Sequence, residues 1–140
     1  MTRNNTYSLK VNASTRHLAK VRGFVEKYAG KFGFDEKTIS DIRLAVDEAC
    51  TNIIKHAYQF DESRDVEIKL GFKNDRIWIS LTDQGQTFNP ESYSKPDIRK
   101  QMKTKKRGGV GVYLIRQLMD DVEYLKRNDT NEIRMYKKRS

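Results

Sequence analysis

The sequence predicts an α+β domain, a two-layer sandwich in which helices cover one face of a mainly antiparallel mixed sheet. Three observations carry this prediction. Short runs of alternating apolar and polar residues, typical of half-buried strands, lie near both ends and in the middle of the chain. Longer segments between them repeat apolar residues every three or four positions, as amphipathic helices do. A length of 140 residues suits one compact unit, so we expect residues 1–140 to form a single domain.

The first half of the chain predicts one strand and two helices. Residues 7–11 alternate as a strand does. The serine and threonine that follow can cap a helix whose apolar positions run to residue 32. Asp35 is a suitable N-cap for a second helix. The apolar stripe of this helix reaches Ala57, so the helix should run to about His56 or Tyr58, which makes it the longest element that the sequence predicts.

The second half predicts a hairpin, a long loop, a third helix and two final strands. Residues 66–72 and 77–82 alternate on either side of a tight Lys-Asn-Asp turn, as the strands of an antiparallel hairpin do. Periodicity is absent from 84–107, and a loop of this length inside a small domain is usually functional. A glycine cluster then opens an amphipathic helix, and residues 122–125 and 133–136 complete the sheet.

The charge of the chain favours an acidic partner. Lysine and arginine number 28 against 19 acidic residues, a formal net charge of +9. The basic residues concentrate in the long loop and the C-terminal tail, and no ladder of stacking aromatic residues interleaves them, so we expect no direct binding of nucleic acid. No apolar run reaches the roughly 18 residues of a membrane span, so we expect a cytoplasmic protein without membrane contact. The single cysteine, Cys50, excludes a disulfide framework.

The second predicted helix carries a polar face beside its apolar stripe. Glu48 and Asn52 are four residues apart and share this face, which Lys55 and His56 extend by one turn. A carboxylate beside a carboxamide can hold a hydrated divalent cation, and the carboxylate can also act as a general base. The alternative is an ordinary solvated helix face, on which such polar pairs are common.

Two glycine-containing motifs follow, one at a strand end and one at a helix start. Asp83 ends the predicted hairpin and can accept a hydrogen bond from an exocyclic amine, while Gly85 lets a ligand or the backbone approach closely. A plain turn is the alternative. The run at 107–111 opens the third helix, where free N–H groups and a fixed positive charge favour binding of a phosphate group. The alternative interpretation of this run is a flexible hinge. This run consists of Arg107, Gly108, Gly109, Val110 and Gly111.

Together, the three segments resemble the ATP-binding fold shared by gyrase, heat-shock protein 90, histidine kinases and MutL, known as the Bergerat or histidine kinase-like ATPase fold. Residues 45–58 resemble the N box of the bacterial anti-sigma factor serine kinases within that superfamily. Residues 83–88 resemble the first glycine box, and residues 107–111 with the Leu-Ile pair beyond them resemble the second. The resemblance extends from the first predicted strand to the last.

The resemblance implies a magnesium-dependent site for ATP and ADP. Glu48 matches the general base that activates the attacking hydroxyl, Asn52 matches the Mg²⁺ ligand, and Asp83 matches the carboxylate that reads the adenine amino group. The basic loop at 84–107 matches a mobile ATP lid. The nucleotide-binding residues implied in this way are Asn52, Lys55, Asp83, Gly85, Arg107, Gly108, Gly109 and Gly111.

The activity that the resemblance implies is that of an ATP-dependent protein serine kinase that also sequesters a sigma factor. Its substrate would be a serine of an anti-anti-sigma protein of the STAS type, and the family tends to form homodimers. Lys20 and Arg22 lie near the position where family members contact the sigma factor, and residues 129–131 are the nearest match to a late adenine-contacting pair. The alternative is a non-catalytic module of the same fold, which binds ATP or a partner without transferring phosphate.

Overall fold

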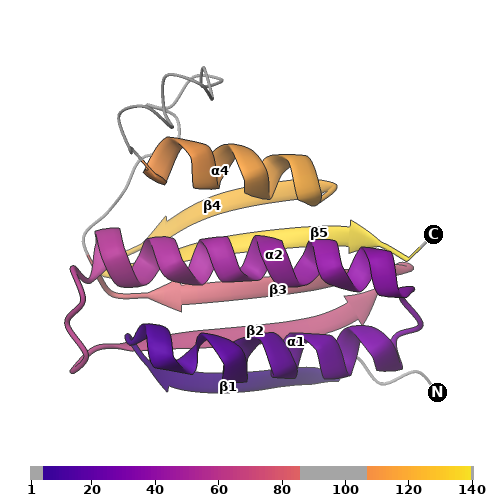
Figure 1. Ribbon diagram of the computed structural model, residues 1–140, viewed down its shortest axis with the longest axis horizontal. Helices are drawn as coiled ribbons and strands as arrows, with labels where there is room; N and C mark the ends of the chain where they lie inside the picture. The colour runs from indigo at the N-terminus through magenta and orange to yellow at the C-terminus, as the bar shows by residue number, and fades with distance from the viewer. Residues whose placement is uncertain (1–4, 86–106, 140) are drawn as a thin grey trace.

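The computed structural model describes residues 5–85 and 107–139, which form two layers (Figure 1). A five-stranded sheet makes one layer, and three helices of the described chain lie side by side across one of its faces. The strands are β1 (Thr6–Asn12), β2 (Asp65–Lys73), β3 (Arg76–Asp83), β4 (Asp121–Arg127) and β5 (Thr130–Lys138). The helices are α1 (Leu18–Lys31), α2 (Glu36–Asn52) and α4 (Arg107–Leu118), with a 3₁₀ turn at Thr15–His17 and a π-helical turn, η2, at Ile53–Ala57. The predicted α+β sandwich is confirmed.

The strands follow the order β1-β2-β3-β5-β4, and each neighbouring pair is antiparallel. The hairpin of β2 and β3 closes at Asn74 and Asp75, whose φ values of 56° and 64° are left-handed, as a two-residue turn between twisted strands requires. The pairing of β3 with β5 sets Asp83 opposite Asn131. The prediction of a mixed sheet included some parallel pairing, but each pair of neighbouring strands in the described residues is antiparallel.

The hydrophobic core lies between the sheet and the helices. Alternate residues of β2 and β3 are fully buried there, among them Ile68, Leu70, Ile79 and Leu81. α2 occupies the middle of the helical layer, between α1 and α4 (Figure 1), and buries the apolar stripe that the sequence predicts. Each large apolar side chain that is fully buried stabilises the fold by about 1.5–3 kcal/mol, so the central position of α2 fixes it firmly against the sheet.

Local polar contacts determine where α2 begins and how it lies against α1. Oδ1 of Asp35 accepts the backbone N–H of Thr38 at 2.8 Å, which confirms the predicted N-cap. Arg22 of α1 donates to Oδ1 of Asp47 on α2 at 2.7 Å. The two helices are therefore joined by an ion pair as well as by apolar packing.

The helical run that starts with α2 extends beyond Asn52 as the π turn η2 and ends at Ala57, as the apolar stripe predicts. The sequence does not predict the change from α to π hydrogen bonding. A π turn widens the helix locally and is frequent at functional sites. Here it directly follows Asn52 and brings Ala57 against the chain that leaves β3.

Four segments that are distant in sequence meet at one end of the domain, on the left in Figure 1. They are the end of α2 with η2, the end of β3, the first turn of α4 and the β4–β5 turn. We call this the site end. Most of the predicted lid at 84–107 lies outside the described residues. No helix of the described chain is long and apolar enough to cross a membrane.

Candidate functional site

Glu48 and Asn52 lie near the C-terminal end of α2, at the site end. Both are partly exposed, whereas Ala49 and Cys50 between them are buried, so the polar face predicted beside the apolar stripe is present. Neither side chain has a hydrogen bond or ion pair with another described residue, and the same is true of Lys55 on η2. A ligand can therefore bind these groups without first breaking a contact to the described part of the protein.

Asp83 is buried at the end of β3, with 7% of its surface exposed. Its Oδ1 accepts the backbone N–H of Gly85 at 2.8 Å and Nδ2 of Asn131 at 3.1 Å. Its Oδ2 has no hydrogen bond to the described residues. A buried carboxylate normally engages both oxygens, so this second oxygen is available to a hydrogen-bond donor of a ligand.

Asn131 belongs to the segment 129–131, the nearest match to a late adenine-contacting pair, but sequence reasoning did not single it out. Its Nδ2 donates to Oδ1 of Asp83 and to the backbone oxygen of Gly85, both at 3.1 Å. The sequence marked residues 129–131 only as a segment, because the register between β3 and β5 is not readable from the chain. Once that register is known, the opposition of Asp83 and Asn131 follows directly.

Gly85 occupies a position with no room for a side chain. A Cβ at this residue would lie 2.5 Å from the backbone oxygen of Ala57 and 2.8 Å from Cδ1 of Tyr58. Both neighbours follow Asn52 closely in the chain. The glycine after Asp83 therefore packs directly on the continuation of the α2 segment, and the first two predicted motifs meet.

Tyr58 and Arg64 were not predicted at this site, although both lie against Gln84. The Tyr58 hydroxyl donates to the backbone oxygen of Asp65 at 2.6 Å and accepts the backbone N–H of Gln84 at 2.8 Å. The Arg64 guanidinium donates to the backbone oxygen of Gln84 and lies 5.1 Å from the centre of the Tyr58 ring. Burial raises the pKa of Tyr58, so its hydroxyl keeps its proton at neutral pH.

The glycine-rich motif lies inside α4, because this helix begins at Arg107. The sequence placed Gly108, Gly109 and Gly111 ahead of the helix; instead they lie within its first five residues. The first four N–H groups of a helix have no partner within it, so this turn can still bind an anion. The side chain of Arg107 lies outside the described part of the structure.

The described residues contain no group of three or more His, Cys, Asp or Glu side chains able to hold a metal ion. A Mg²⁺ ion that is bound through a nucleotide needs no such group. It commonly keeps several waters and takes one or two protein oxygens together with phosphate oxygens. The side-chain amide of Asn52 is an oxygen donor of this kind.

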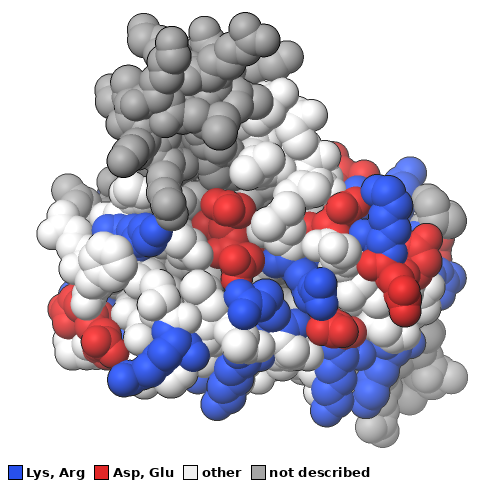
Figure 2. All heavy atoms as spheres, viewed as in Figure 1, with Lys and Arg blue, Asp and Glu red and all other residues white. Residues whose placement is uncertain are grey.

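Basic side chains gather over α1 on the face drawn in Figure 2. Arg22 is ion-paired with Asp47, whereas Lys20 on the same helix is exposed. The positive potential of this helix surface therefore comes from Lys20 and the lysines further along α1. An acidic protein surface would be its electrostatic complement.

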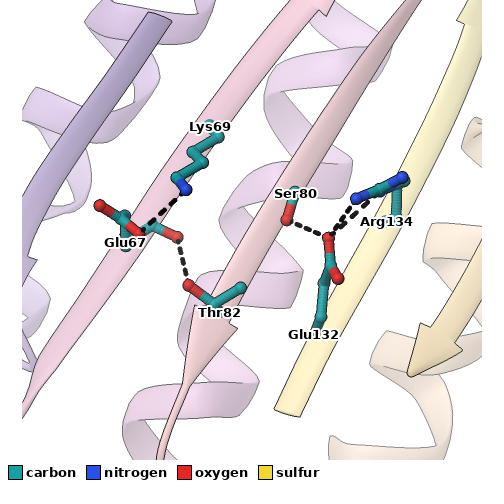
Figure 3. A network of polar contacts seen from close by, with 6 residues as sticks. All are labelled: Glu67, Lys69, Ser80, Thr82, Glu132 and Arg134. Atoms are coloured by element: carbon teal, nitrogen blue, oxygen red, sulfur yellow. Dashed lines mark hydrogen bonds and ion pairs between the residues drawn. The ribbon is translucent and has the colours of Figure 1, made fainter. Parts of the chain in front are cut away.

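The face of the sheet opposite the helices carries a polar network (Figure 3). Ser80 of β3 donates to Glu132 of β5, and Arg134 binds the same carboxylate at 2.9 Å. The Arg134 guanidinium also lies 5.6 Å from the ring of the partly exposed Trp78. These side chains line a hollow of ≈ 570 Å³ that no described helix covers.

Comparison with known proteins adds an independent line of argument. The model of the histidine kinase-like ATPase domain family matches residues 11–137. The chain is similar to serine-protein kinase RsbW of Halalkalibacterium halodurans, with 37% identity over 84% of this chain and 74% of that protein. It is similar to serine-protein kinase RsbW of Bacillus cereus, with 33% identity over 89% of this chain and 80% of that protein. A crystal structure of the RsbU and RsbW domains of a Mycobacterium tuberculosis protein shares the fold, with a TM-score of 0.69 and 15% identity over 96% of this chain and 32% of that one.

Proposed function

The chain belongs to the histidine kinase-like ATPase domain family, and from that premise we propose that it is a cytoplasmic, ATP-dependent serine-protein kinase that also binds a sigma factor. Its substrate is a serine of an anti-anti-sigma protein of the STAS type. One observation carries the proposal. At the site end, the buried carboxylate of Asp83 has one oxygen without a partner among the described residues, and the same holds for the side chains of Glu48 and Asn52 on the polar face of α2.

The described residues fit an adenine nucleotide. Oδ2 of Asp83 is an acceptor for an amino-group donor, while Oδ1 is held by Gly85 and Asn131. The first four N–H groups of α4 have no acceptor within the helix and can donate to phosphate oxygens. Lys55 adds a positive charge just beyond Asn52. In this proposal the loop at 84–107 is the ATP lid.

Asn52 and Glu48 divide the chemistry between them. Asn52 would hold Mg²⁺ through its amide oxygen, and the bound ion would neutralise part of the phosphate charge. Glu48 is the general base: one of its carboxylate oxygens accepts the proton of the serine hydroxyl. The bond from the serine Oγ to the γ-phosphorus forms as the bond from that phosphorus to the β–γ bridging oxygen breaks, which leaves ADP and a phosphoserine.

The sigma-factor surface in this proposal is the exposed side of α1 around Lys20. Arg22 adds less to the positive charge of this surface than a free arginine would, because its guanidinium is ion-paired with Asp47 at 2.7 Å. Exposed charges at the edge of a protein interface mainly accelerate association and make its rate dependent on salt. Replacing Lys20 with glutamate should therefore slow sigma-factor association while ATP binding stays at the wild-type level.

The proposal also includes a homodimer, formed through the uncovered face of the sheet that carries Trp78. A tryptophan that is partly exposed beside a hollow is a common anchor at protein interfaces. Sedimentation of the full chain at micromolar concentration tests this part, and a monomer at that concentration contradicts it.

Phosphate transfer from γ-labelled ATP tests the proposed activity. The full chain is incubated with magnesium and a cognate anti-anti-sigma protein, and the matched control is that substrate with its target serine replaced by alanine. We expect label on the serine substrate and none on the control. A folded chain that binds ATP in calorimetry but labels no cognate substrate would instead be the non-catalytic module. A folded chain that binds no ATP would exclude the nucleotide site itself.

A further inference from the structure

Tyr58 links three segments at the site end. Its backbone N–H donates to the backbone oxygen of Ile53 at 2.9 Å, which closes the helical run of α2 and η2. Its hydroxyl donates to the first residue of β2, Asp65, and accepts from Gln84, the residue after β3. Only 6% of Tyr58 is exposed. The side chain therefore fixes the end of the α2 segment against the end of β3 from a buried position.

Arg64 completes this link from the surface. Its guanidinium donates to the backbone oxygen of Gln84, while the Tyr58 hydroxyl holds the backbone N–H of the same residue. Both polar groups of the Gln84 peptide backbone are thus bound by side chains of the segment between η2 and β2. Gly85 adds a direct backbone contact with Ala57. Gln84 has little freedom to move relative to α2.

The neighbour of Gln84 is Asp83, whose carboxylate reads the adenine base in the proposed function. In the proposed function the opposite end of the nucleotide is bound through Asn52, the last residue of α2, which lies in the same helical run that Tyr58 closes. The link through Tyr58 therefore sets how Asp83 lies relative to Asn52. The Tyr58 hydroxyl binds the backbone of Asp65 and of Gln84, so we expect the residue to act through these contacts and not on the nucleotide.

We infer that Tyr58, assisted by Arg64, is a positioning residue that holds the Asp83 carboxylate in register with the polar face of α2 and so determines the preference for adenine over other purines. This inference rests on the proposed function. A purine with a carbonyl oxygen in place of the 6-amino group presents an acceptor and no donor at that position to Asp83, so discrimination depends on how well that carboxylate is placed.

The experiment compares the affinities of ATP and inosine triphosphate for wild type and Tyr58→Phe by calorimetry with magnesium. Phenylalanine keeps the buried ring and removes the hydroxyl. We expect ATP affinity to fall by about five- to tenfold, the scale of one hydrogen bond, while affinity for inosine triphosphate changes by less than about twofold. The ratio of the two affinities should fall accordingly, which a purely structural role would not produce in a folded variant.

Tyr28→Phe is the matched control, because the Tyr28 hydroxyl on α1 makes no hydrogen bond with the described residues. It should leave both affinities unchanged. A folded Tyr58→Phe protein with the wild-type affinity ratio would overturn the inference. If Tyr58→Phe does not fold, the same measurement is made on Arg64→Ala, which removes the exposed contact to Gln84. A reduced ratio of ATP to inosine triphosphate affinity supports the inference, and an unchanged ratio overturns it. A wild type without preference for ATP would instead overturn the adenine assignment of Asp83 in the proposed function.

Discussion

Replacing Gly85 with alanine tests the tightest backbone contact at the site end. The added Cβ would lie 2.5 Å from the backbone oxygen of Ala57, 2.8 Å from its carbonyl carbon and 2.8 Å from Cδ1 of Tyr58. Backbone atoms cannot rotate away, so the chain after β3 has to move. Forcing a methyl group into a packed region costs about 1–3 kcal/mol, and the smaller entropy of the unfolded chain offsets about 0.4–1 kcal/mol of that. We expect a net destabilisation of about 1–2 kcal/mol.

This loss translates into a measurable change in melting temperature. An unfolding entropy of about 2.1 cal/mol/K per residue gives ~0.3 kcal/mol/K for 140 residues. Tm should therefore fall by roughly 3–7 °C in a calorimetric scan. Because Asp83 accepts the Gly85 N–H, its carboxylate moves with the displaced chain, and ATP affinity should fall by about tenfold.

Gly23→Ala is the control for this measurement. Gly23 lies within α1, and an added Cβ meets nothing within 4 Å. Alanine in a helix interior is favoured over glycine by about 0.5–1 kcal/mol, so Tm should rise by roughly 2–3 °C with ATP binding unchanged. The packing argument is refuted if Gly85→Ala melts at the wild-type temperature and binds ATP with the wild-type affinity.

Three further predictions concern individual side chains. Asp83→Asn replaces a carboxylate by a partly donating amide, so calorimetry should show ATP affinity lower by about tenfold; equal affinity would remove Asp83 from adenine recognition. Asn52→Ala should lose magnesium-dependent ATP binding and phosphate transfer together, and retention of both would contradict the metal assignment. Burial, followed by the charge of Asp47, raises the pKa of Cys50 from 9.0 to about 12. The folded state thus favours the neutral thiol. The contribution of this group to the free energy of unfolding is full below pH 9.0 and is lost as the pH rises towards 12. A thiol reagent at about pH 8 should label Cys50 only after denaturation, and rapid labelling of the native protein would contradict its burial.

The elements of the fold were predictable because their signals are local. Alternating apolar and polar residues predict β2 and β3, apolar residues at helical spacing predict α1 and α2, and the N-cap residue Asp35 marks where α2 begins. The anti-sigma factor kinase resemblance rests on motifs that are contiguous in sequence, and the family match over residues 11–137 confirms the histidine kinase-like ATPase fold. The roles of Glu48, Asn52 and the other predicted site residues stay predictions.

The parts that sequence reasoning missed depend on contacts between distant segments. Asn131 reaches Asp83 only because β5 pairs with β3 in one register, and a shift by one residue would turn it to the other face of the sheet. The contacts of Tyr58 and Arg64 with Gln84 require the π turn and the strand end to meet in space. The early start of α4 conflicts with the low helix propensity of glycine, which favours a later start.

The measurement that tests the central claim most directly pairs ATP affinity with single-turnover phosphate transfer, on wild type and on Glu48→Gln. Glutamine keeps the size and helix propensity of the side chain and removes the base. The account predicts unchanged ATP affinity, because Asn52, Asp83 and the start of α4 are untouched, and a transfer rate to the partner serine that is lower by roughly 10²-fold or more. An active wild type whose Glu48→Gln variant transfers phosphate equally fast would contradict the assignment of Glu48 as the general base.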